Sequence, residues 1–516
     1  MKPKALVWLD KNFVIYGITN RLQQKLDFDK FAIVDGNFSQ KFFFDNQDLV
    51  QFEKQWYFAD NVEVNNVNPD LEYLSRFEKK FDINLWELVY SDRLFYPKYN
   101  KYFEFTKTQI LSLLEQECKL FEKIIGEIKP DFLLINMIIY HHAFLLYKMC
   151  KKLEIPIFTI EPTHFDSKWE VREEIDQLID MSIFHNLPLK KQKTQKQLLS
   201  FLKEYKPEIH GEKNKTKYKN SKINKISAAF KFFMNEKENT EKHYAYFGQS
   251  KSKVLTKGTA TLHNIKKKKN ESFLEESSIS KIPSNNKFIY YPLTLEPERM
   301  MIMGAPYYTN QISVIENIAK SIPIDHLLYV KEHPAMIALG WRDSSFYKQI
   351  IDFTNVKLIH PSVSHDELIQ NSSLVITLRG TAGLEAAFYG KPSICFSQYS
   401  GYSELSSVNV ISNIEELPKI LPKWMDMKVD FSELNKYVNY IENTTFDFYH
   451  VDFTSELSKK FNYQSGFLND TNISSNMMSE FLDEYHNMFE NAADMYYQKI
   501  TKKIDGSIVH KETYNP

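Results

Sequence analysis

The sequence has few cysteines, and their spacing gives no sign of the chemistry that cysteine pairs carry. Its 516 residues contain three of them, Cys118, Cys150 and Cys395, which lie far apart and within apolar surroundings. No C-x-x-C pair and no Cys/His cluster occurs, so neither a thiolate metal site nor a disulfide framework is indicated. We interpret the three as small core residues of a protein in a reducing compartment.

A strong charge of one sign is also absent. The chain carries 65 basic and 66 acidic residues, which gives a formal net charge of −1. No global field therefore draws nucleic acid or acidic substrates to this protein, and any electrostatic recognition has to be local.

Long hydrophobic runs are missing as well. "FLLINMIIY" (residues 132–140) is among the most apolar stretches and is too short to span a bilayer. Asp10, Lys11 and Asn12 interrupt the apolar run near the N-terminus, so it does not resemble a signal peptide. We expect a cytoplasmic protein, and we leave open a peripheral position at the inner face of the cell membrane.

Strand and helix patterns alternate in two regions, which predicts an α/β fold. "ALVWL", "KFAIVD", "KPDFLLIN" and "PIFTIEP" are strand candidates in the first region, and "KFIYYPL", "HLLYV", "VKLI", "SLVITL" and "SICFS" in the second. Helix patterns separate the strands of the second region, which indicates a parallel, doubly wound sheet. We expect an N-terminal Rossmann-like domain (1–185), a Lys-rich connector or helical insertion (186–284), a second Rossmann-like domain (285–425) and a helical C-terminal region with a tail (426–516). The two Rossmann-like domains are expected to face a cleft.

The Lys-rich connector contains "KKQKTQKQ", "KNKTKYKNSK" and "KKKKN". Such charge runs are typical of a solvated linker. Within it, Ile223, Ile226, Phe230 and Phe233 fall on one helical stripe, with lysines elsewhere. This stripe fits either a helix packed on a domain or a basic amphipathic helix at a membrane surface.

Four polar loops follow the predicted strands of the second region: "PLTLEPERM", "KEHPAM", "HPSVSHDE" and "RGTAG". Because the carboxyl ends of parallel strands meet at one edge of a sheet, we expect these loops to line a ligand site.

The stretch "LRGTAGLEAAFYGKP" (residues 378–392) has features of a phosphate-binding turn. Gly380 and Gly383 would let backbone N–H groups approach a phosphate, and Thr381 can donate its hydroxyl or cap the following helix. Arg379 would neutralise phosphate, and Glu385 would accept hydrogen bonds from ribose hydroxyls. The stretch matches neither a Walker A loop nor G-x-G-x-x-G. A plain capped helix after a tight turn is the alternative.

His333 lies where the strand candidate "HLLYV" ends, between Lys331, Glu332 and Pro334. The proline restricts the local backbone, and a histidine held there can donate a hydrogen bond to a leaving-group phosphate, with Glu332 orienting or charging it. A packed or surface histidine is the alternative. Since this half has no H-E-x-x-H or D-x-D pair, we expect protein groups rather than a metal or another cofactor to meet the phosphate charge.

The block from Lys287 to Phe396 resembles the bacterial capsule polysaccharide biosynthesis family, which includes Kdo transferases of the GT-B type. The resemblance implies that the second domain binds a nucleotide-sugar donor, a CMP-Kdo-like or other CMP- or UDP-sugar. The family's His-Pro motif matches His333 and Pro334, and its Gly-Thr-x-Gly-x-Glu-Ala motif matches Gly380, Thr381, Gly383, Glu385 and Ala386. We also expect donor contacts from residues beside or within these motifs, Lys331, Glu332, Arg379 and Ala382, and from Ser362, in the loop where such proteins hold base and ribose. Arg379 and the long connector depart from the family pattern.

The resemblance also implies a catalytic group from the N-terminal domain and a C-terminal helix that packs back on that domain. For the catalytic group, "PIFTIEPTHFD" supplies Glu161, our first choice, and His164, while Asp10 follows the first strand. His141 and His142 would contact acceptor. A capping or surface role is the alternative for each. "EFLDEYHNMFENAADMYYQKI" (residues 480–500) has the spacing of a packed helix.

Three functions fit the sequence. The first is a metal-independent glycosyltransferase that acts on a nucleotide-sugar donor and a glycan or glycolipid acceptor. The second is a nucleotide-sugar epimerase of the same architecture, which would turn over donor without acceptor. The third is a non-catalytic protein that binds a membrane through the Lys-rich segment. Nucleic acid is not expected as a partner, because the segment lacks a recognisable nucleic-acid-binding fold.

Overall fold

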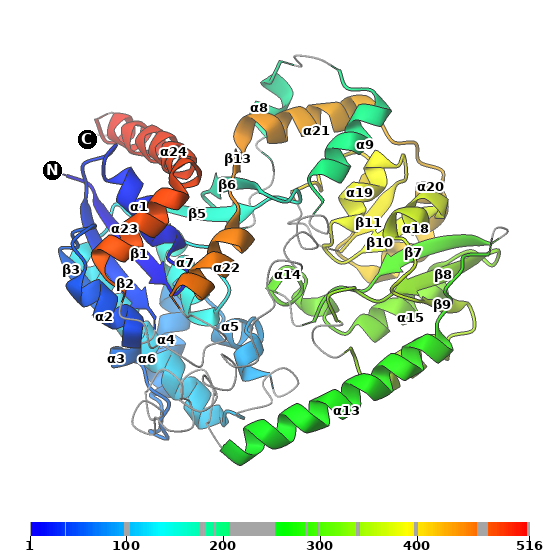
Figure 1. Ribbon diagram of the computed structural model, residues 1–516, viewed down its shortest axis with the longest axis horizontal. Coiled ribbons are helices and arrows are strands. Elements are labelled where there is room, and N and C mark those ends of the chain that lie inside the picture. The colour runs from blue at the N-terminus through cyan, green and yellow to red at the C-terminus, as the bar shows by residue number, and fades with distance from the viewer. Residues whose placement is uncertain are drawn as a thin grey trace. The chain divides into compact units, whose positions relative to one another are not determined.

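The structure is a computed structural model (Figure 1). It describes residues 2–36, 38–96, 104–175, 179, 181–188, 192–206, 253–283, 286–296, 299–336, 341–396, 401–461 and 473–512. These residues form two compact units. The first ends at Ile175 and resumes at Thr444, and the second takes the residues between them that the structure describes. Residues 426–443, which the sequence analysis assigned to a C-terminal region, therefore belong to the second unit.

The first unit is built on a seven-stranded sheet with the order β13-β6-β5-β4-β1-β2-β3. Its strands are β1 (Lys4–Asp10), β2 (Asp29–Asp35), β3 (Lys54–Tyr57), β4 (Phe132–Ile135), β5 (Ile157–Pro162), β6 (Lys168–Arg172) and β13 (Phe446–Asp447). Pairing is parallel from β5 to β3, and β6 and β13 are added antiparallel. The four strands predicted for this region are confirmed.

Helices connect the strands of this sheet: α1 (Val14–Leu22), α2 (Phe38–Asn46), α3 (Phe58–Asn61), α4 (Leu71–Phe81), α5 (Leu85–Tyr90), α6 (Lys107–Ile128) and α7 (His141–Lys152). The longest, α6, begins at a capping box in which Thr106 and Gln109 satisfy one another's backbone N–H groups, and it ends at Lys129 in the left-handed conformation.

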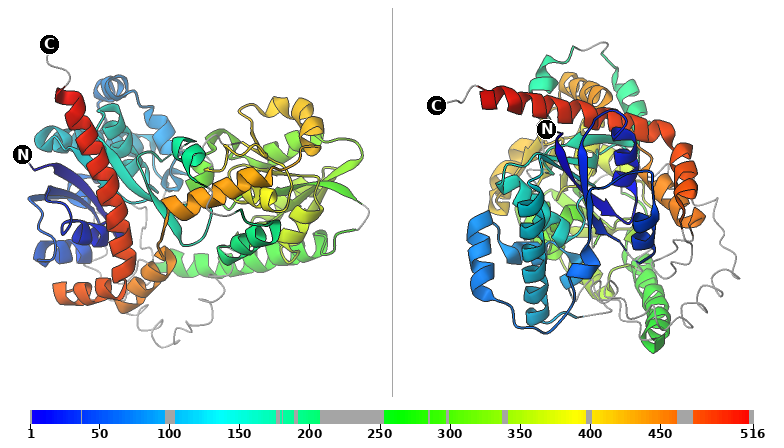
Figure 2. Two further views of the ribbon diagram at one scale, coloured as in Figure 1. Left: turned by 90° about the horizontal axis from the view of Figure 1, so that it is seen from above. Right: turned by 90° about the vertical axis from the view of Figure 1, so that its left-hand side faces the viewer.

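C-terminal helices return to the first unit, as predicted. These are α22 (His450–Lys460), α23 (Ser475–Glu484) and α24 (His486–Glu512), and α24 runs beside α1 (Figure 2). Phe489, Ala493 and Tyr496 of α24 are fully buried in the same core as Val14 and Ile18 of α1. This burial holds the C-terminal helix α24 against the N-terminal helix α1.

Gly17 permits the close contact between α1 and α24. A Cβ added there would lie 2.5 Å from a ring carbon of Phe489, which is buried and has no room to retreat. We expect Gly17→Ala to lower the free energy of unfolding by about 1–3 kcal/mol, as overpacking does. Gly126→Ala, in open space on α6, is the matched control and should raise stability by about 0.5–1 kcal/mol. Urea unfolding measures both, and a Gly17→Ala protein as stable as wild type would contradict the tight contact.

The second unit is built on a six-stranded, wholly parallel sheet with the order β12-β11-β10-β7-β8-β9. Its strands are β7 (Lys287–Pro292), β8 (His326–Lys331), β9 (Val356–Ile359), β10 (Leu374–Thr377), β11 (Ser393–Cys395) and β12 (Val408–Val410). The five predicted strands are confirmed, and β12 extends the sheet. Gly390, at a φ of 71°, supplies the predicted stop after helix α19 (Ala382–Phe388).

Further helices complete the second unit: α8 (Met181–Asn186), α9 (Gln195–Glu204), α13 (Lys253–Ser277), α14 (Arg299–Ile302), α15 (Gln311–Ser321), α17 (Ser344–Ile351), α18 (His365–Asn371), α20 (Leu417–Met425) and α21 (Phe431–Thr444). Helices α9 and α13 come from the predicted Lys-rich connector and pack against α19 and α17 respectively. The stripe at residues 223–233 lies outside the described residues.

Both sheets follow the doubly wound pattern. In each, the first strand lies in the middle, two later strands extend to one side, and the next strands extend to the other. Strand order therefore reverses between β1 and β4 and between β7 and β10. Such switch points, at the carboxyl ends of the strands, are where α/β sheets bind ligands. The predicted α/β fold with two Rossmann-like domains is confirmed, and a cleft between the domains stays a prediction.

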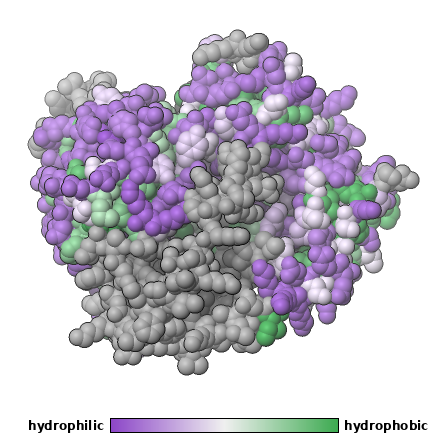
Figure 3. All heavy atoms as spheres, viewed as in Figure 1, coloured by the Kyte–Doolittle hydropathy of each residue, from purple (hydrophilic) through white to green (hydrophobic). Residues whose placement is uncertain are grey.

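No helix among the described residues is long and apolar enough to cross a membrane. The described surface on the face shown in Figure 3 is mainly hydrophilic, with scattered hydrophobic residues.

Candidate active site

Asp10 lies at the switch point of the first unit. Its carboxylate accepts hydrogen bonds from Asn136 Nδ2 at 2.7 Å and from the backbone N–H of Asn12 at 3.0 Å. Burial raises the pKa of Asp10 above its usual value. Phe13, three residues on, has a φ of 56°, a strained conformation for a bulky residue and one often found at functional sites. A partly buried carboxylate of raised pKa suits a general base.

Glu161 and His164 occupy different surroundings. Glu161 is only 3% exposed and lies opposite Glu170 in the antiparallel pairing of β5 with β6. Its Oε1 lies 3.5 Å from the hydroxyl of Thr159. His164 is half-buried in the turn that joins β5 to β6. Because a base has to reach the proton that it takes, the structure favours Asp10 over Glu161, the first choice from sequence.

His141 and His142 are fully buried at the start of α7. They cannot touch an acceptor, which corrects the role suggested from sequence. Their partners are carboxylates: Asp92 and Glu117 for His141, and Asp35 for His142.

Glu332, at the end of β8, is 1% exposed. Its Oε2 accepts hydrogen bonds from Arg342 Nε at 2.9 Å and from the Tyr347 hydroxyl at 2.8 Å. Its Oε1 accepts the backbone N–H of His333 at 2.6 Å. This carboxylate holds the His333 loop in place, in keeping with the orienting role suggested from sequence, and a donor contact through Glu332 stays a prediction.

Arg342 joins two of the polar loops. Besides Glu332, its guanidinium contacts Glu296 at 2.6 Å, and Glu296 accepts a further hydrogen bond from Gln311 at 2.7 Å. Glu296 follows β7 and Glu332 follows β8, so one buried arginine fixes both loops relative to each other. We call Arg342, Glu332 and Glu296 the arginine brace.

His333 is neutral in this setting. Its Nδ1 accepts the backbone N–H of Ala335 at 3.2 Å, which places the remaining proton on Nε2. Burial and the positive charges of Arg342, His365 and Lys331 lower the pKa of His333 to about 4. At neutral pH the ring therefore offers a neutral Nε2–H donor.

This low pKa should make part of the stability sensitive to acid. In the unfolded chain the histidine has its usual pKa of about 6.5. Between pH 6.5 and 4 the unfolded state therefore binds more protons than the folded state, and the free energy of unfolding decreases as the pH is lowered. Between pH 7 and 5 we expect wild type to lose about 1.5–2 kcal/mol more than His333→Gln. His450, whose pKa burial also lowers to about 4, is present in both proteins and cancels. Equal losses in urea titrations would show that His333 titrates normally.

Glu385 lies in the first turn of α19 and is 7% exposed. Its Oε1 accepts the Thr381 hydroxyl at 2.8 Å, and its Oε2 contacts Lys206 Nζ at 2.9 Å and His365 Nε2 at 3.5 Å. Burial disfavours the charged form of Glu385 and so raises its pKa. The interactions with His365 and Lys206 have the larger effect and hold the pKa of Glu385 well below its usual range. Sequence reasoning assigned Glu385 to ribose and Thr381 to phosphate, whereas here the two bind each other.

His365 contacts one of the predicted motifs directly. Its Nδ1 lies 2.8 Å from the Tyr290 hydroxyl, and its Nε2 lies 3.5 Å from Glu385 Oε2. Its electrostatic effect also contributes to the lowered pKa of His333.

The glycines of the "RGTAG" turn allow Tyr402 to pack closely against the turn. The Tyr402 hydroxyl donates to the Gly380 carbonyl at 2.6 Å, and a Cβ at Gly383 would lie 2.8 Å from that hydroxyl. The Gly380 N–H donates to Thr377 Oγ1 at 3.0 Å. Thr381 makes no side-chain cap on α19. The Gly380 N–H is thus already bonded and Thr381 does not cap α19, while phosphate binding at this turn stays a prediction.

The other predicted donor-binding residues lie at the same edge. Lys331, Arg379 and Ala382 are buried at 5%, 7% and 4% exposure. Pro334 and Ser362 are exposed, and the Ser362 hydroxyl lies 2.6 Å from His360 Nδ1.

The model of the capsule polysaccharide biosynthesis protein family matches residues 190–402. The matched residues make up less than half of the chain. The match takes in α9, the whole of β7 to β11, His333 and Glu385, so the resemblance predicted from the sequence is confirmed.

Several solved structures are similar, at low scores. A β-Kdo 2,7 transferase, KpsC, of Thermosulfurimonas dismutans is 12% identical, covers 66% of this chain and 89% of its own, and has a TM-score of 0.30. UDP-GlcNAc 2-epimerases of Methanocaldococcus jannaschii and Neisseria meningitidis are 12% identical, cover 85% and 89% of this chain and 99% and 100% of theirs, and have TM-scores of 0.24. No curated protein matches the sequence.

Sequence reasoning missed three residues of the site in this family region: Lys206, Arg342 and His365. His365 stands in the loop "HPSVSHDE", where its polarity was a usable signal. Lys206 follows α9 and Arg342 follows an undescribed stretch, and neither belongs to a recognisable motif.

Proposed function

We propose that this protein is a glycosyltransferase of capsule or surface polysaccharide biosynthesis that uses a nucleotide-sugar donor, either CMP-Kdo-like or another CMP- or UDP-sugar. The observation that carries the proposal is the neutral His333 at the rim of a Rossmann-like sheet, next to positive charge. Lys331 and His365 both act on His333 there. The same charges attract a phosphate, while the neutral ring keeps an N–H to donate.

Catalysis in this proposal depends on charge that develops on the leaving group. As the sugar departs, negative charge grows on the phosphate oxygen, and a fixed N–H donor stabilises that charge more strongly than it stabilises the ground state. The arginine brace contributes by fixing the His333 backbone before substrate arrives. Protein groups, without a metal at the phosphate, perform this step.

Asp10 is the group that we assign to the acceptor. Burial raises its pKa, and Asn136 orients its carboxylate. A carboxylate of this kind can accept the proton of an attacking hydroxyl. Asp10→Asn should therefore lower transfer without changing donor binding.

The test is acceptor dependence. Purified protein is incubated with CMP-, UDP- and GDP-sugars, with and without a glycan or glycolipid acceptor, and release of free nucleotide is followed. A transferase releases nucleotide quickly only when acceptor is present. Acceptor-independent conversion of a UDP-sugar to its epimer would instead support the epimerase, and no turnover of any donor would leave a binding protein.

We also propose that the protein acts in the cytoplasm, at the inner face of the cell membrane. Support comes from the runs of lysine between residues 190 and 270, whose positive charge suits anionic lipid. Co-sedimentation with anionic vesicles that is lost at high salt supports this location. Equal recovery with neutral vesicles would contradict it.

A further inference from the structure

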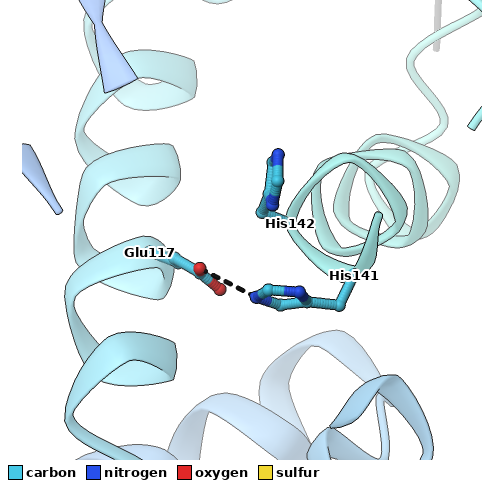
Figure 4. Close-up of side chains that lie close together, drawn as sticks. All are labelled: Glu117, His141 and His142. Atoms are coloured by element: carbon cyan, nitrogen blue, oxygen red, sulfur yellow. Dashed lines mark hydrogen bonds and ion pairs between the residues drawn. The ribbon is translucent and has the colours of Figure 1, made fainter. Parts of the chain in front are cut away.

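A second cluster of ionisable side chains lies inside the first unit. It consists of Glu117 from α6 and of His141 and His142 from the first turn of α7, all with 0% exposure. One ligand atom from each lies within 4.8 Å of the other two, and His141 Nε2 is 3.0 Å from Glu117 Oε1. Figure 4 shows Glu117 facing the histidine pair from the neighbouring helix.

Carboxylates hold the outer nitrogens of both histidines. Asp92 Oδ2 lies 2.8 Å from His141 Nδ1, and Asp35 Oδ2 lies 3.1 Å from His142 Nε2. Metal-binding histidines characteristically donate their second nitrogen in this way, which fixes the tautomer and turns the other nitrogen to the ion. Here that arrangement leaves Nε2 of His141 and Nδ1 of His142 as the ligating atoms.

The charges within this group also favour a cation. Three carboxylates, Asp35, Asp92 and Glu117, surround two imidazoles. Buried negative charge is costly, and a divalent ion among these side chains offsets two of the three carboxylate charges.

We propose that Glu117, His141 and His142 form a binding site for a divalent transition metal, with Zn²⁺ the ion that the donor set suits best. Two imidazole nitrogens and one carboxylate are a common zinc set, whereas Mg²⁺ and Ca²⁺ prefer oxygen alone. Ligands of four-coordinate zinc lie roughly 3.3 Å apart, so the 3.0 Å pair already fits and the third ligand closes by a side-chain rotation. The second oxygen of Glu117 can supply a fourth bond.

Such an ion has a structural role, because no ligand reaches solvent. It joins α6 to the start of α7, and α7 follows β4 and Asn136, the residue that orients Asp10. The site does not depend on the proposed transferase activity, and it does not place a metal at the phosphate.

Elemental analysis tests the site directly. The untagged full-length protein is produced in zinc-supplemented medium, purified without chelator and exchanged into metal-free buffer. We expect about one zinc per chain in wild type. Glu117→Gln and His142→Gln should each retain less than about a tenth of that amount, because the loss of one ligand from a three-residue set abolishes tight binding. His450→Gln, which alters a half-buried histidine of the same unit outside the cluster, is the matched control and should keep the ion.

A second measurement covers variants that fold poorly. Wild-type protein stripped with chelator should gain thermal stability when Zn²⁺ alone is added, since an ion that binds the folded state stabilises it. Added Co²⁺ should give the visible absorption of a bound ion. Wild type without zinc that shows neither response to added metal, or variants that retain as much zinc as wild type, would overturn the proposal.

Discussion

Replacing His333 by alanine is expected to lower kcat by roughly ten- to a thousandfold while changing KM for the donor much less. The ring donates from Nε2 at neutral pH, because Nδ1 already accepts the Ala335 N–H and the pKa of the ring is near 4. Alanine removes a donor whose hydrogen bond strengthens as charge grows on the leaving phosphate. Steady-state rates with saturating acceptor measure the change.

His326→Ala provides the control on the same strand. His326 begins β8, at the sheet edge opposite to His333, and bonds Asp325 and Ser373. Its loss should affect stability and leave the rate per folded molecule within about twofold of wild type, since it touches no reacting group. If His333→Ala transfers sugar as fast as His326→Ala does, His333 is not a catalytic residue, and the leaving-group argument fails.

Both sheets could largely be predicted from the sequence, because most of their strands are apolar runs bounded by turns. All five strands predicted for the second unit are present, and so are the four predicted for the first. The short strands β3 and β6 were missed, since "KQWY" and "KWEVR" are only four and five residues long. Intrinsic propensity alone does not identify strands this short.

Of the candidate site, the sequence predicted only which loops form it. The rule for parallel sheets places His333, Thr381 and Glu385 at the carboxyl ends of the strands, where in the structure His365 contacts Glu385. Which groups pair was not predictable, because Lys206, just after α9, is far from Glu385 in sequence. Thr381 and Glu385, four residues apart in a helical turn, bind each other, a pairing that helix geometry allows but does not require.

Arg342→Ala is expected to lower the free energy of unfolding of the second unit by about 3–5 kcal/mol. The substitution leaves Glu332 and Glu296 inside the protein without their cation, at 1% and 7% exposure. Breaking a buried ion pair costs far more than the pair contributes, because the remaining charge has lost both water and partner. Urea or thermal unfolding measures the loss, and transfer activity should fall as well, since Glu332 also holds the backbone N–H of His333.

The exposed pair of Lys320 and Glu316 shows that burial, rather than distance, decides the size of this effect. Its N–O separation is 2.6 Å, the same as between Arg342 and Glu296, but its side chains are 65% and 43% exposed against 5% and 6%. Water already screens the exposed charges, so Lys320→Ala should cost at most about 1 kcal/mol. The double variant Arg342→Met with Glu332→Gln should recover part of the loss, because it removes a stranded charge together with its partner. Equal costs for Arg342→Ala and Lys320→Ala would mean that solvent reaches the arginine brace, and the fixed His333 loop would then lack its support.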